Sequence, residues 1–223
     1  MKFKEFYENE VYKDFQASDK PRLWQVFALE VIRKEELEGR SILDVGAGPG
    51  FILNQLTAKN LDRHALDLSK KCVAYLNEQG IIANEIDITS DTFPYRDSFF
   101  DYVIFTEVIE HLPFPEHTMS EIFRVLKPGG KLFISTHNTF NVYMRLRYLL
   151  GVLPTPELDV SNNGQHLRLY NYRILKNILS SSGFSCYVNK SWFSLKSLSF
   201  YVPDWLTPLL SRHLLLICTK GIN

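Results

Sequence analysis

The sequence predicts an α/β protein with a doubly wound, mostly parallel sheet, and two observations support that prediction. Short apolar runs alternate with helix-length segments between residues 41 and 137, which is typical of βα units whose sheet is covered on both faces. A glycine-rich turn follows the first of these runs. Because such sheets bind ligands outside the carboxyl ends of their strands, we expect the functional site at that edge.

Each element is expected from a local pattern. Residues 22–39 carry apolar side chains at helical spacing and end in charges and Gly39, which predicts an amphipathic helix. Residues 51–60 and 170–184 are also expected to be helical, the second closed by Gly183. Five strands are predicted in the runs SILDVGAG, HALDLS, ANEIDIT, FDYVIFTE and KLFISTH. Residues 185–195 and 212–220 are expected to form two further strands that pair antiparallel at the sheet edge.

Composition limits the class of protein. The chain has 223 residues, 45% hydrophobic and 22% charged, which suits a single domain over residues 1–223 with a full core. Lys plus Arg equals Asp plus Glu at 25 each, so no global positive field would attract DNA or RNA. The three cysteines contain no C-x-x-C pair, which favours a reducing compartment, and the charged N-terminus does not resemble a signal peptide. We expect a cytoplasmic protein whose membrane contact is at most peripheral.

Three regions of the predicted domain are expected to cover a substrate. They are an N-terminal helical lid over residues 1–39 and two insertions, residues 139–165 and 194–211. We expect residues 139–165 to be long and irregular. Together the three regions hold Arg145, Arg147 and the aromatic residues Phe6, Tyr7, Tyr12, Trp24, Tyr143, Tyr148, Trp192, Phe193, Phe200, Tyr201 and Trp205. Most of these rings taken singly are expected in the core, but as a group they favour a small, partly apolar acceptor.

The glycine turn indicates a nucleotide-like ligand. ILDVGAGPGF places Gly46, Gly48 and Gly50 after a strand and before a helix, where the backbone can turn sharply and approach a ligand. The spacing is G-x-G-x-G, whereas the dinucleotide fingerprint needs G-x-G-x-x-G, so we expect no NAD binding.

Acidic residues stand at the ends of consecutive predicted strands. Asp44 precedes the glycines, Asp67 ends the next strand in HALDLS, and Asp87 follows in EIDIT. A carboxylate at the second position can accept both hydroxyls of a ribose, and one at the third can accept an amino group from adenine. Each residue alone would more often be a loop or capping residue.

TEVIEHL, residues 106–112, crowds two carboxylates and an imidazole after the fourth predicted strand. On a helix Glu107, Glu110 and His111 would share one face. Three interpretations remain open: the carboxylates complement the helix dipole, His111 acts as a general base, or the cluster binds Mg, Mn or Zn.

These motifs together resemble the class I S-adenosylmethionine-dependent methyltransferases, nearest to the ubiquinone-biosynthesis O-methyltransferases. The resemblance covers about residues 40–137, through ILDVGAGPG, ALDLS, FPYRDSFFDYVIFTEVIEHL and VLKPGGKLFIST. It implies a Rossmann-like, seven-stranded sheet of order 3-2-1-4-5-7-6 with strand 7 antiparallel. Pro128 is expected to end a helix, and Gly129 and Gly130 to make the turn into the fifth strand.

The resemblance also implies roles for individual residues. S-adenosyl-L-methionine would be bound by Asp44, Gly46, Ala47, Gly48, Gly50, Asp67, Leu68, Asp87, Ile88 and Thr106. The pattern E-x-x-E-H is similar to that of the ubiquinone enzymes and of small-RNA 2′-O-methyltransferases, which implies a divalent metal on Glu107, Glu110, His111 and His166. His111, His166 and His137 are the expected catalytic residues.

The expected activity is S-adenosylmethionine-dependent O-methylation of a small-molecule hydroxyl, with possible metal assistance. Sugar, glycan or RNA-terminal hydroxyls are alternative acceptors, although MRLRY is the only notable basic cluster, which argues against RNA. A non-catalytic module that binds S-adenosylmethionine is a further alternative, because fold does not fix function. Neither the acceptor nor the oligomeric state follows from the sequence.

Overall fold

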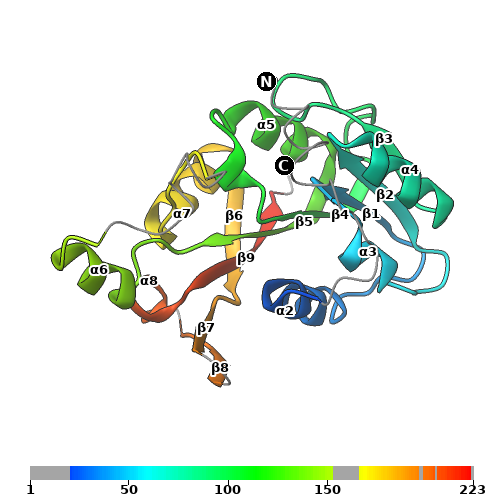
Figure 1. Cartoon of the computed structure of the whole chain (residues 1–223). Coiled ribbons are helices and arrows are strands. Elements are labelled where there is room, and N and C mark those ends of the chain that lie inside the picture. Colours follow the sequence, from blue (N-terminus) through cyan, green and yellow to red (C-terminus); the bar gives the residue numbers. More distant parts are fainter. Residues whose placement is uncertain (1–20, 153–165, 196–197, 204, 222–223) are drawn as a thin grey trace.

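One mixed sheet forms the centre of the fold (Figure 1). The structure is a computed structural model and describes residues 21–152, 166–195, 198–203 and 205–221. The parallel strands are β1 Ser41–Val45, β2 Asp62–Asp67, β3 Ile82–Glu85, β4 Phe100–Thr106 and β5 Leu126–His137. The later strands are β6 Phe184–Asn189, β7 Trp192–Leu195, β8 Leu198–Tyr201 and β9 His213–Lys220.

The strand order confirms the fold class. The sheet runs β3-β2-β1-β4-β5-β9, β9 is antiparallel to β5, and β6 pairs antiparallel with β9. Counting β9 as the seventh strand and β6 as the sixth gives the predicted order 3-2-1-4-5-7-6. The strand predicted over residues 185–195 is broken at Lys190, and its second half forms β7, which pairs with β8 as a hairpin. The Lys190 N–H donates to Leu215 O, and the Ser191 hydroxyl accepts from the Leu215 N–H, so a side-chain hydrogen bond replaces part of the regular ladder there.

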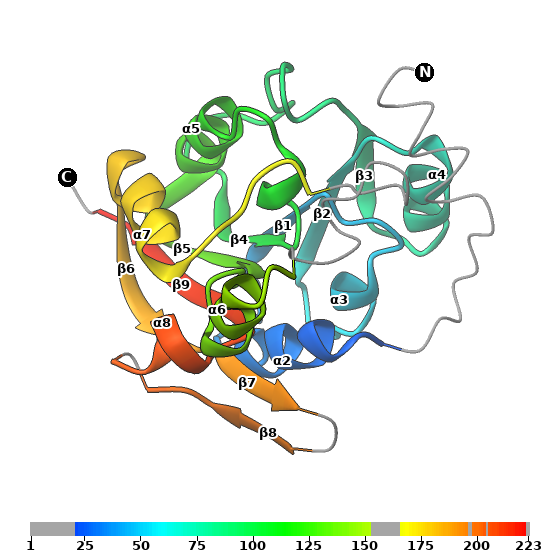
Figure 2. The ribbon, with the colours of Figure 1, turned by 60° about the vertical axis from the view of Figure 1, so that its left-hand side comes forward.

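Helices cover both faces of the sheet (Figure 2). The helices are α2 Leu23–Ile32, α3 Phe51–Asn54, α4 Lys70–Glu78, α5 Glu116–Val125, α6 Val142–Leu149, α7 Tyr172–Ser181 and α8 Thr207–Leu210. Alternate residues of β4 face opposite layers: Ile104 belongs to a core with α2, α3 and α4, whereas Val103 and Phe105 belong to a core with α5 and α7. Burying each such side chain contributes about 1.5–3 kcal/mol, so the strand is fixed from both sides.

Two predicted helices are shorter than expected. α2 ends at Ile32 instead of Gly39, and α3 ends at Asn54 instead of residue 60. Arginine side chains donate hydrogen bonds to carbonyls at the end of α3. Arg63 donates to Leu53 O, and Arg33 donates to Gln55 O. Those carbonyls are therefore satisfied without a further helical turn.

The expected turn into the fifth strand differs in detail. α5 ends at Val125, before Pro128, and β5 already begins at Leu126. Leu126 pairs with Phe100 and Lys131 pairs with Tyr102, so residues 127–130 bulge outward opposite a single residue of β4. Gly129 has φ 76°, which explains the glycine there.

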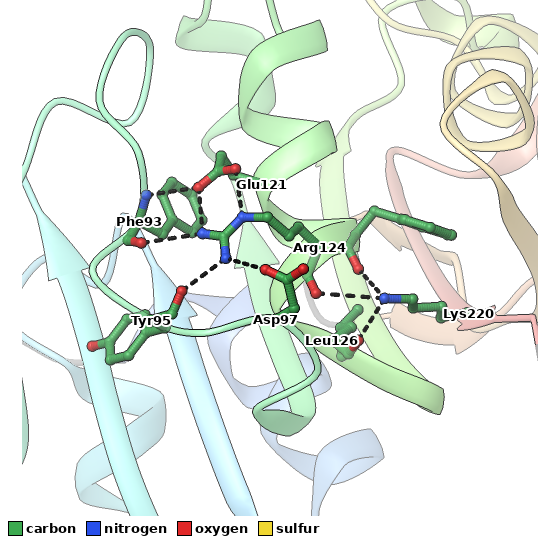
Figure 3. Close-up of polar contacts among 8 residues, drawn as sticks. Phe93, Tyr95, Asp97, Glu121, Arg124, Leu126 and Lys220 are labelled. Atoms are coloured by element: carbon green, nitrogen blue, oxygen red, sulfur yellow. Dashed lines mark hydrogen bonds and ion pairs between the residues drawn. The ribbon is translucent and has the colours of Figure 1, made fainter.

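Arg124 ties α5 to the loop before β4 (Figure 3). Its guanidinium donates to both carboxylate oxygens of Glu121, at 2.8 and 2.7 Å, and to Asp97 at 2.8 Å. The carbonyls of Phe93 and Tyr95 accept the remaining donors. All five N–H groups are thus used, and Glu121 and Asp97 raise the pKa of Arg124 further above its usual range, against the opposing effect of burial. We call Arg124, Glu121, Asp97, Phe93 and Tyr95 the Arg124 hub.

The remaining sequence expectations concern the helix before Gly183, the lid and the insertion over residues 139–165, and they can be compared with the structure only within the described residues. The predicted helix ending at Gly183 is present as α7, whereas part of the supposedly irregular region 139–165 is helical, as α6. Residues 1–20 and 153–165, which include much of the predicted lid and insertion, lie outside the described residues. Among the described helices, none combines the length and apolar character needed to cross a membrane.

Candidate active site

The glycine turn lies where β1 ends. Gly46, Gly48 and Gly50 have φ of 75°, 53° and 69°, in the left-handed region that other residues adopt at a cost. A side chain at Gly46 would place its Cβ 2.6 Å from Val108 Cγ2, so the turn is packed against the segment that follows β4. Four of its amides are used internally, because the Gly46 and Ala47 N–H groups donate to Leu66 O, Gly48 N–H to Asp67 Oδ2 and Gly50 N–H to Ala47 O. At these positions the turn therefore offers a ligand close backbone approach more than free donors.

The three acidic residues gather at the same edge of the sheet. Asp67 ends β2, and its carboxylate accepts from the N–H groups of Gly48, at 2.7 Å, and Ser69, at 2.9 Å. Asp87 lies just after β3 and accepts from the Thr89 N–H and hydroxyl. Asp44 is buried in β1, and burial together with the charge of Asp67 raises the pKa of Asp44 to about 8. Asp44 is therefore mostly protonated at neutral pH.

The remaining expected cofactor residues stand around this edge. Thr106 ends β4 and is buried beside Ser135 of β5. Ile88 is buried, and its carbonyl accepts from the Thr118 hydroxyl. Ala47 and Leu68 are half-buried in the loops after β1 and β2. The structure brings these residues to one edge, while their contact with a cofactor stays a prediction.

The expected helix over TEVIEHL is wrong. Ile109–His111 forms a single 3₁₀ turn, and Glu107 has φ 55°. A non-glycine residue in this region costs about 1–3 kcal/mol, and such strain concentrates at functional sites. The Glu107 N–H donates to Ser135 O and its carboxylate accepts from the Ser135 hydroxyl at 2.8 Å, so contacts with β5 replace the helix. Glu107, Glu110 and His111 consequently do not share one α-helical face.

His137, at the end of β5, lies between the two carboxylates. Its Nδ1 is 2.8 Å from Glu107 Oε2 and 3.6 Å from Glu110 Oε1. Burial alone would lower the pKa of His137, but Glu107 and Glu110 raise it to about 10. At neutral pH and without a metal, His137 is an imidazolium and has no free lone pair to accept a proton.

The Glu110 carboxylate differs from those of Asp67, Asp87 and Glu107 because it has no hydrogen-bond donor among the described residues. It is 2% exposed, and neither of its carboxylate oxygens forms a hydrogen bond with any described residue. Burial of an ionised carboxylate is costly unless it is paired, and its nearest cation, His137, is beyond hydrogen-bonding distance. A buried acceptor without a donor indicates a site for a ligand or a proton.

Three further imidazoles surround this pair. His166 has its ring centre 5.3 Å from that of His137 and 4.9 Å from that of His111. His213 begins β9, pairs in register with His137, and has its ring centre 4.4 Å from it. We call Glu107, Glu110, His137, His166 and His213 the carboxylate–imidazole cluster.

Two trios in this cluster have ligand atoms that all lie within 4.8 Å of one another. They are Glu107 with His137 and His213, and Glu110 with His137 and His166. The structure therefore brings together Glu110 and His166 of the predicted metal set, and Glu107 joins them through His137. His111 contacts the His166 ring but belongs to neither trio among the described residues. Its roles as ligand and base stay predictions.

Sequence reasoning missed His213, although a signal was present. The terminal strand was expected to pair antiparallel at the sheet edge, and the fifth strand was expected to end at His137. A strand that starts beside the end of its antiparallel neighbour places its first residues at that site. The exact partner depends on register, which no local pattern specified.

The expected acceptor-covering aromatics have different environments. Trp192 is fully buried, with its ring stacked on His213 at 5.0 Å and on Phe27 at 4.6 Å. Tyr143 on α6 and Trp205 beside α8 are exposed, at 52% and 77%. Trp192 thus packs against the cluster, whereas α6, which lies beside α8 (Figure 2), carries exposed apolar side chains.

Comparisons with known proteins agree with the fold described above. The family model described as "Methyltransferase domain" matches residues 18–188. The chain is 32% identical over 131 residues to a ubiquinone biosynthesis O-methyltransferase from Azoarcus sp. strain BH72, covering 53% of this chain and 55% of that protein. It is 35% identical over 137 residues to the protein of the same name from Nitrosococcus oceani, covering 56% and 58%. The match spans about half the length of these relatives.

Solved structures share the fold over almost the whole chain. A S-adenosylmethionine-dependent methyltransferase from Thermotoga maritima, described as a possible histamine N-methyltransferase, aligns with a TM-score of 0.70 and 18% identity, covering 98% of each chain. A S-adenosylmethionine-dependent methyltransferase from Archaeoglobus fulgidus aligns with a TM-score of 0.64 and 17% identity, covering 95% and 97%. At these identities the likeness shows the fold alone.

Proposed function

We propose that this chain, which belongs to the methyltransferase domain family, transfers a methyl group to a hydroxyl oxygen of a small, partly apolar molecule. S-adenosylmethionine is the methyl donor of this family. The observation that carries the proposal is the carboxylate–imidazole cluster at the carboxyl ends of β4 and β5, beside the glycine turn. Its buried Glu110, whose carboxylate accepts no hydrogen bond from any described residue, supplies the proton acceptor that methylation of a hydroxyl requires.

The glycine turn and the acidic residues fit S-adenosylmethionine. We assign Gly46, Gly48 and Gly50 to the methionine portion, because all three have left-handed backbone angles and form the sharp turn at the carboxyl end of β1. We assign Asp67 to the ribose hydroxyls, because its carboxylate is held at the carboxyl end of β2 by the N–H groups of Gly48 and Ser69. Asp87 is placed for the adenine amino group. The bound cofactor supplies an electrophilic methyl group on a sulfonium.

Holding the acceptor oxygen in line with this methyl group is the chain's first task. Positioning of reactants at near-attack distance is worth up to ~7–11 kcal/mol. Thr106 and the turn at Glu107 are fixed by β5, so the wall beside the reacting atoms is rigid. The relatives named for ubiquinone biosynthesis support a hydroxyl as the acceptor.

Removal of the hydroxyl proton is the second task. His137 is already protonated, so we assign the proton to Glu110, whose oxygens have no donor among the described residues. His137 then balances charge between the two carboxylates. General-base catalysis of this kind contributes ~10²–10⁴-fold. A divalent metal held by the carboxylate–imidazole cluster would instead lower the pKa of the hydroxyl and fix its direction.

Other acceptors are less well supported. A sugar or glycan diol could use the same two carboxylates, whereas the chain has no excess of basic residues to hold RNA. Buried Asp67 and the three left-handed glycines argue against a degenerate, non-catalytic binding module.

The proposal is tested by cofactor titration followed by an acceptor screen. Calorimetry should show S-adenosylmethionine binding and no NAD binding. Transfer of labelled methyl groups to a panel of phenols, catechols and vicinal diols should then be lost in Glu110→Gln. Glu116→Gln, the same change at an exposed carboxylate of α5, should retain it. Absence of cofactor binding, or equal transfer by both variants, would contradict the proposal.

A further inference from the structure

We infer that the cluster binds a divalent transition-metal ion through Glu107, His137 and His213, with His213 as a ligand that the sequence motif does not contain. Binding of the ion follows from these side chains alone. Its part in catalysis, activation of the acceptor hydroxyl, rests on the proposed function.

The three ligands come from adjacent strands. Glu107 directly follows β4, His137 ends β5, and His213 begins β9 as the register partner of His137. Their ligand atoms lie within 4.8 Å of one another. A tetrahedral ion with bonds of about 2.0–2.2 Å holds its ligands roughly 3.4 Å apart, so the ligand atoms would have to approach one another by at most ~1.4 Å.

The ligands are held in place by their neighbours. The buried Trp192 ring stacks on His213 at 5.0 Å with an interplanar angle of 7°. The Ser135 hydroxyl donates to Glu107 Oε1, which leaves Oε2 directed to His137. Oriented ligands with outer partners are the usual arrangement at protein metal sites.

Glu110 is a second, independent indication of a cation. Only 2% of Glu110 is exposed. It lies beside His137, and its carboxylate has no hydrogen-bond donor among the described residues. Two carboxylates therefore lie beside the His137 ring, and a divalent ion bound there would compensate their negative charge.

The ligand types select the metal. Two imidazoles and one carboxylate form the set found in catalytic zinc sites and in sites for non-haem iron, and imidazole favours Zn²⁺, Co²⁺, Fe²⁺ or Ni²⁺ over Mg²⁺. Fewer than four protein ligands leave a coordination position for an acceptor oxygen. We therefore expect Zn²⁺ to bind and Mg²⁺ not to compete with it.

This trio is preferred to the one with Glu110 and His166 for a structural reason. Its three residues flank or belong to paired strands of the sheet, whereas His166 lies outside the regular elements, between the end of α6 and the start of α7. His111 has a ring contact with His166 and belongs to neither trio among the described residues.

The test measures metal binding to the whole chain without cofactor. Zn²⁺ titration by calorimetry and the visible spectrum of added Co²⁺ should both report one site. His213→Phe keeps an aromatic ring against Trp192 but removes the ligand, and should weaken binding by more than the ~10–100-fold typical of losing an outer partner. His137→Asn should do the same. His117→Asn, on α5 outside the cluster, should bind as the wild type does.

The outcomes separate this inference from the proposed function. Unchanged Zn²⁺ affinity in His213→Phe, or loss only in His111→Asn, would overturn the metal assignment while cofactor binding and methyl transfer could still stand. Zn²⁺ binding with no methyl transfer would support the site and contradict the activity. If His213→Phe does not fold, nitrogen NMR of wild-type histidine side chains decides: Zn²⁺ should shift the ring signals of His137 and His213, and unshifted signals refute it.

Discussion

Two charged clusters lie at opposite ends of β4 and β5, and they differ in how completely their polar atoms are paired. In the Arg124 hub, near the amino ends of the strands, five guanidinium donors meet five acceptors (Figure 3). In the carboxylate–imidazole cluster, at the carboxyl ends, buried Glu110 has no hydrogen bond among the described residues and Glu107 is in a strained conformation.

The difference indicates what each cluster is for. A fully paired network stabilises the fold and needs nothing further. A buried, partly paired network costs stability, and proteins keep such groups where a ligand or proton completes them. Substitutions in the hub should therefore change stability, and substitutions in the carboxylate–imidazole cluster should change activity.

The largest expected effect is on methyl transfer. Glu110→Gln removes the proton acceptor and should lower the transfer rate by ~10²–10⁴-fold. The free energy of unfolding should change by about 1 kcal/mol, because the Glu110 carboxylate has no hydrogen bond to a described residue to lose and its ion pair with His137 is long, at 3.6 Å. Single-turnover assays and urea denaturation measure the two quantities. Loss of stability without loss of activity would mean that the carboxylate–imidazole cluster serves the fold and not the reaction.

Breaking the hub should give the opposite result. Arg124→Met leaves the Glu121 carboxylate, 8% exposed, without its cation, and should lower the free energy of unfolding by about 2–4 kcal/mol. Thermal denaturation should show a corresponding fall in Tm, with Lys127→Met, a more exposed ion pair, as the milder control. The rate per folded molecule should stay that of the wild type; a large drop would link the hub to catalysis.

The pH dependence of stability should report His137. Its pKa is raised from 6.5 to about 10, so the folded state holds a proton that the unfolded chain releases. This contribution is complete below pH 6.5 and is lost as pH rises through about 10. Urea denaturation should show stability falling over that range in the wild type. His137→Asn should flatten that part of the curve, and an unchanged slope would show that His137 is not the group involved.

A smaller effect should come from the strained backbone at Glu107. Glu107→Gly can adopt φ 55° freely, whereas Glu107→Ala cannot, so the glycine variant should be more stable than the alanine variant by about 1 kcal/mol. Both lose the carboxylate and should be equally poor in methyl transfer. Equal stability in chemical denaturation would mean that the turn relaxes when Glu107 is removed.

Much of the fold followed from local patterns. The runs ending at Asp67, Thr106 and His137 are strands because they are apolar on both faces, and that property is visible in the sequence. Gly46, Gly48 and Gly50 predicted the turn after β1, because only glycine adopts those backbone angles freely.

The geometry of the candidate site was less accessible. The turn at Glu107 depends on hydrogen bonds to Ser135, 28 residues further along the chain, and these outweigh the helical spacing of TEVIEHL. His213 meets His137 through strand register, a property of paired strands and not of either sequence alone. The sequence therefore identified the chemistry of the site but not its full set of residues.

A crystal structure with S-adenosylhomocysteine would test the central claim most directly. A methyl acceptor at about 3–3.5 Å from the reacting methyl group, hydrogen-bonded to the cluster, requires the cofactor sulfur to lie within roughly 6–8 Å of the Glu110 carboxylate. We predict that distance, with the ribose hydroxyls on Asp67. A cofactor absent from the glycine turn, or a sulfur directed away from the cluster, would contradict the account.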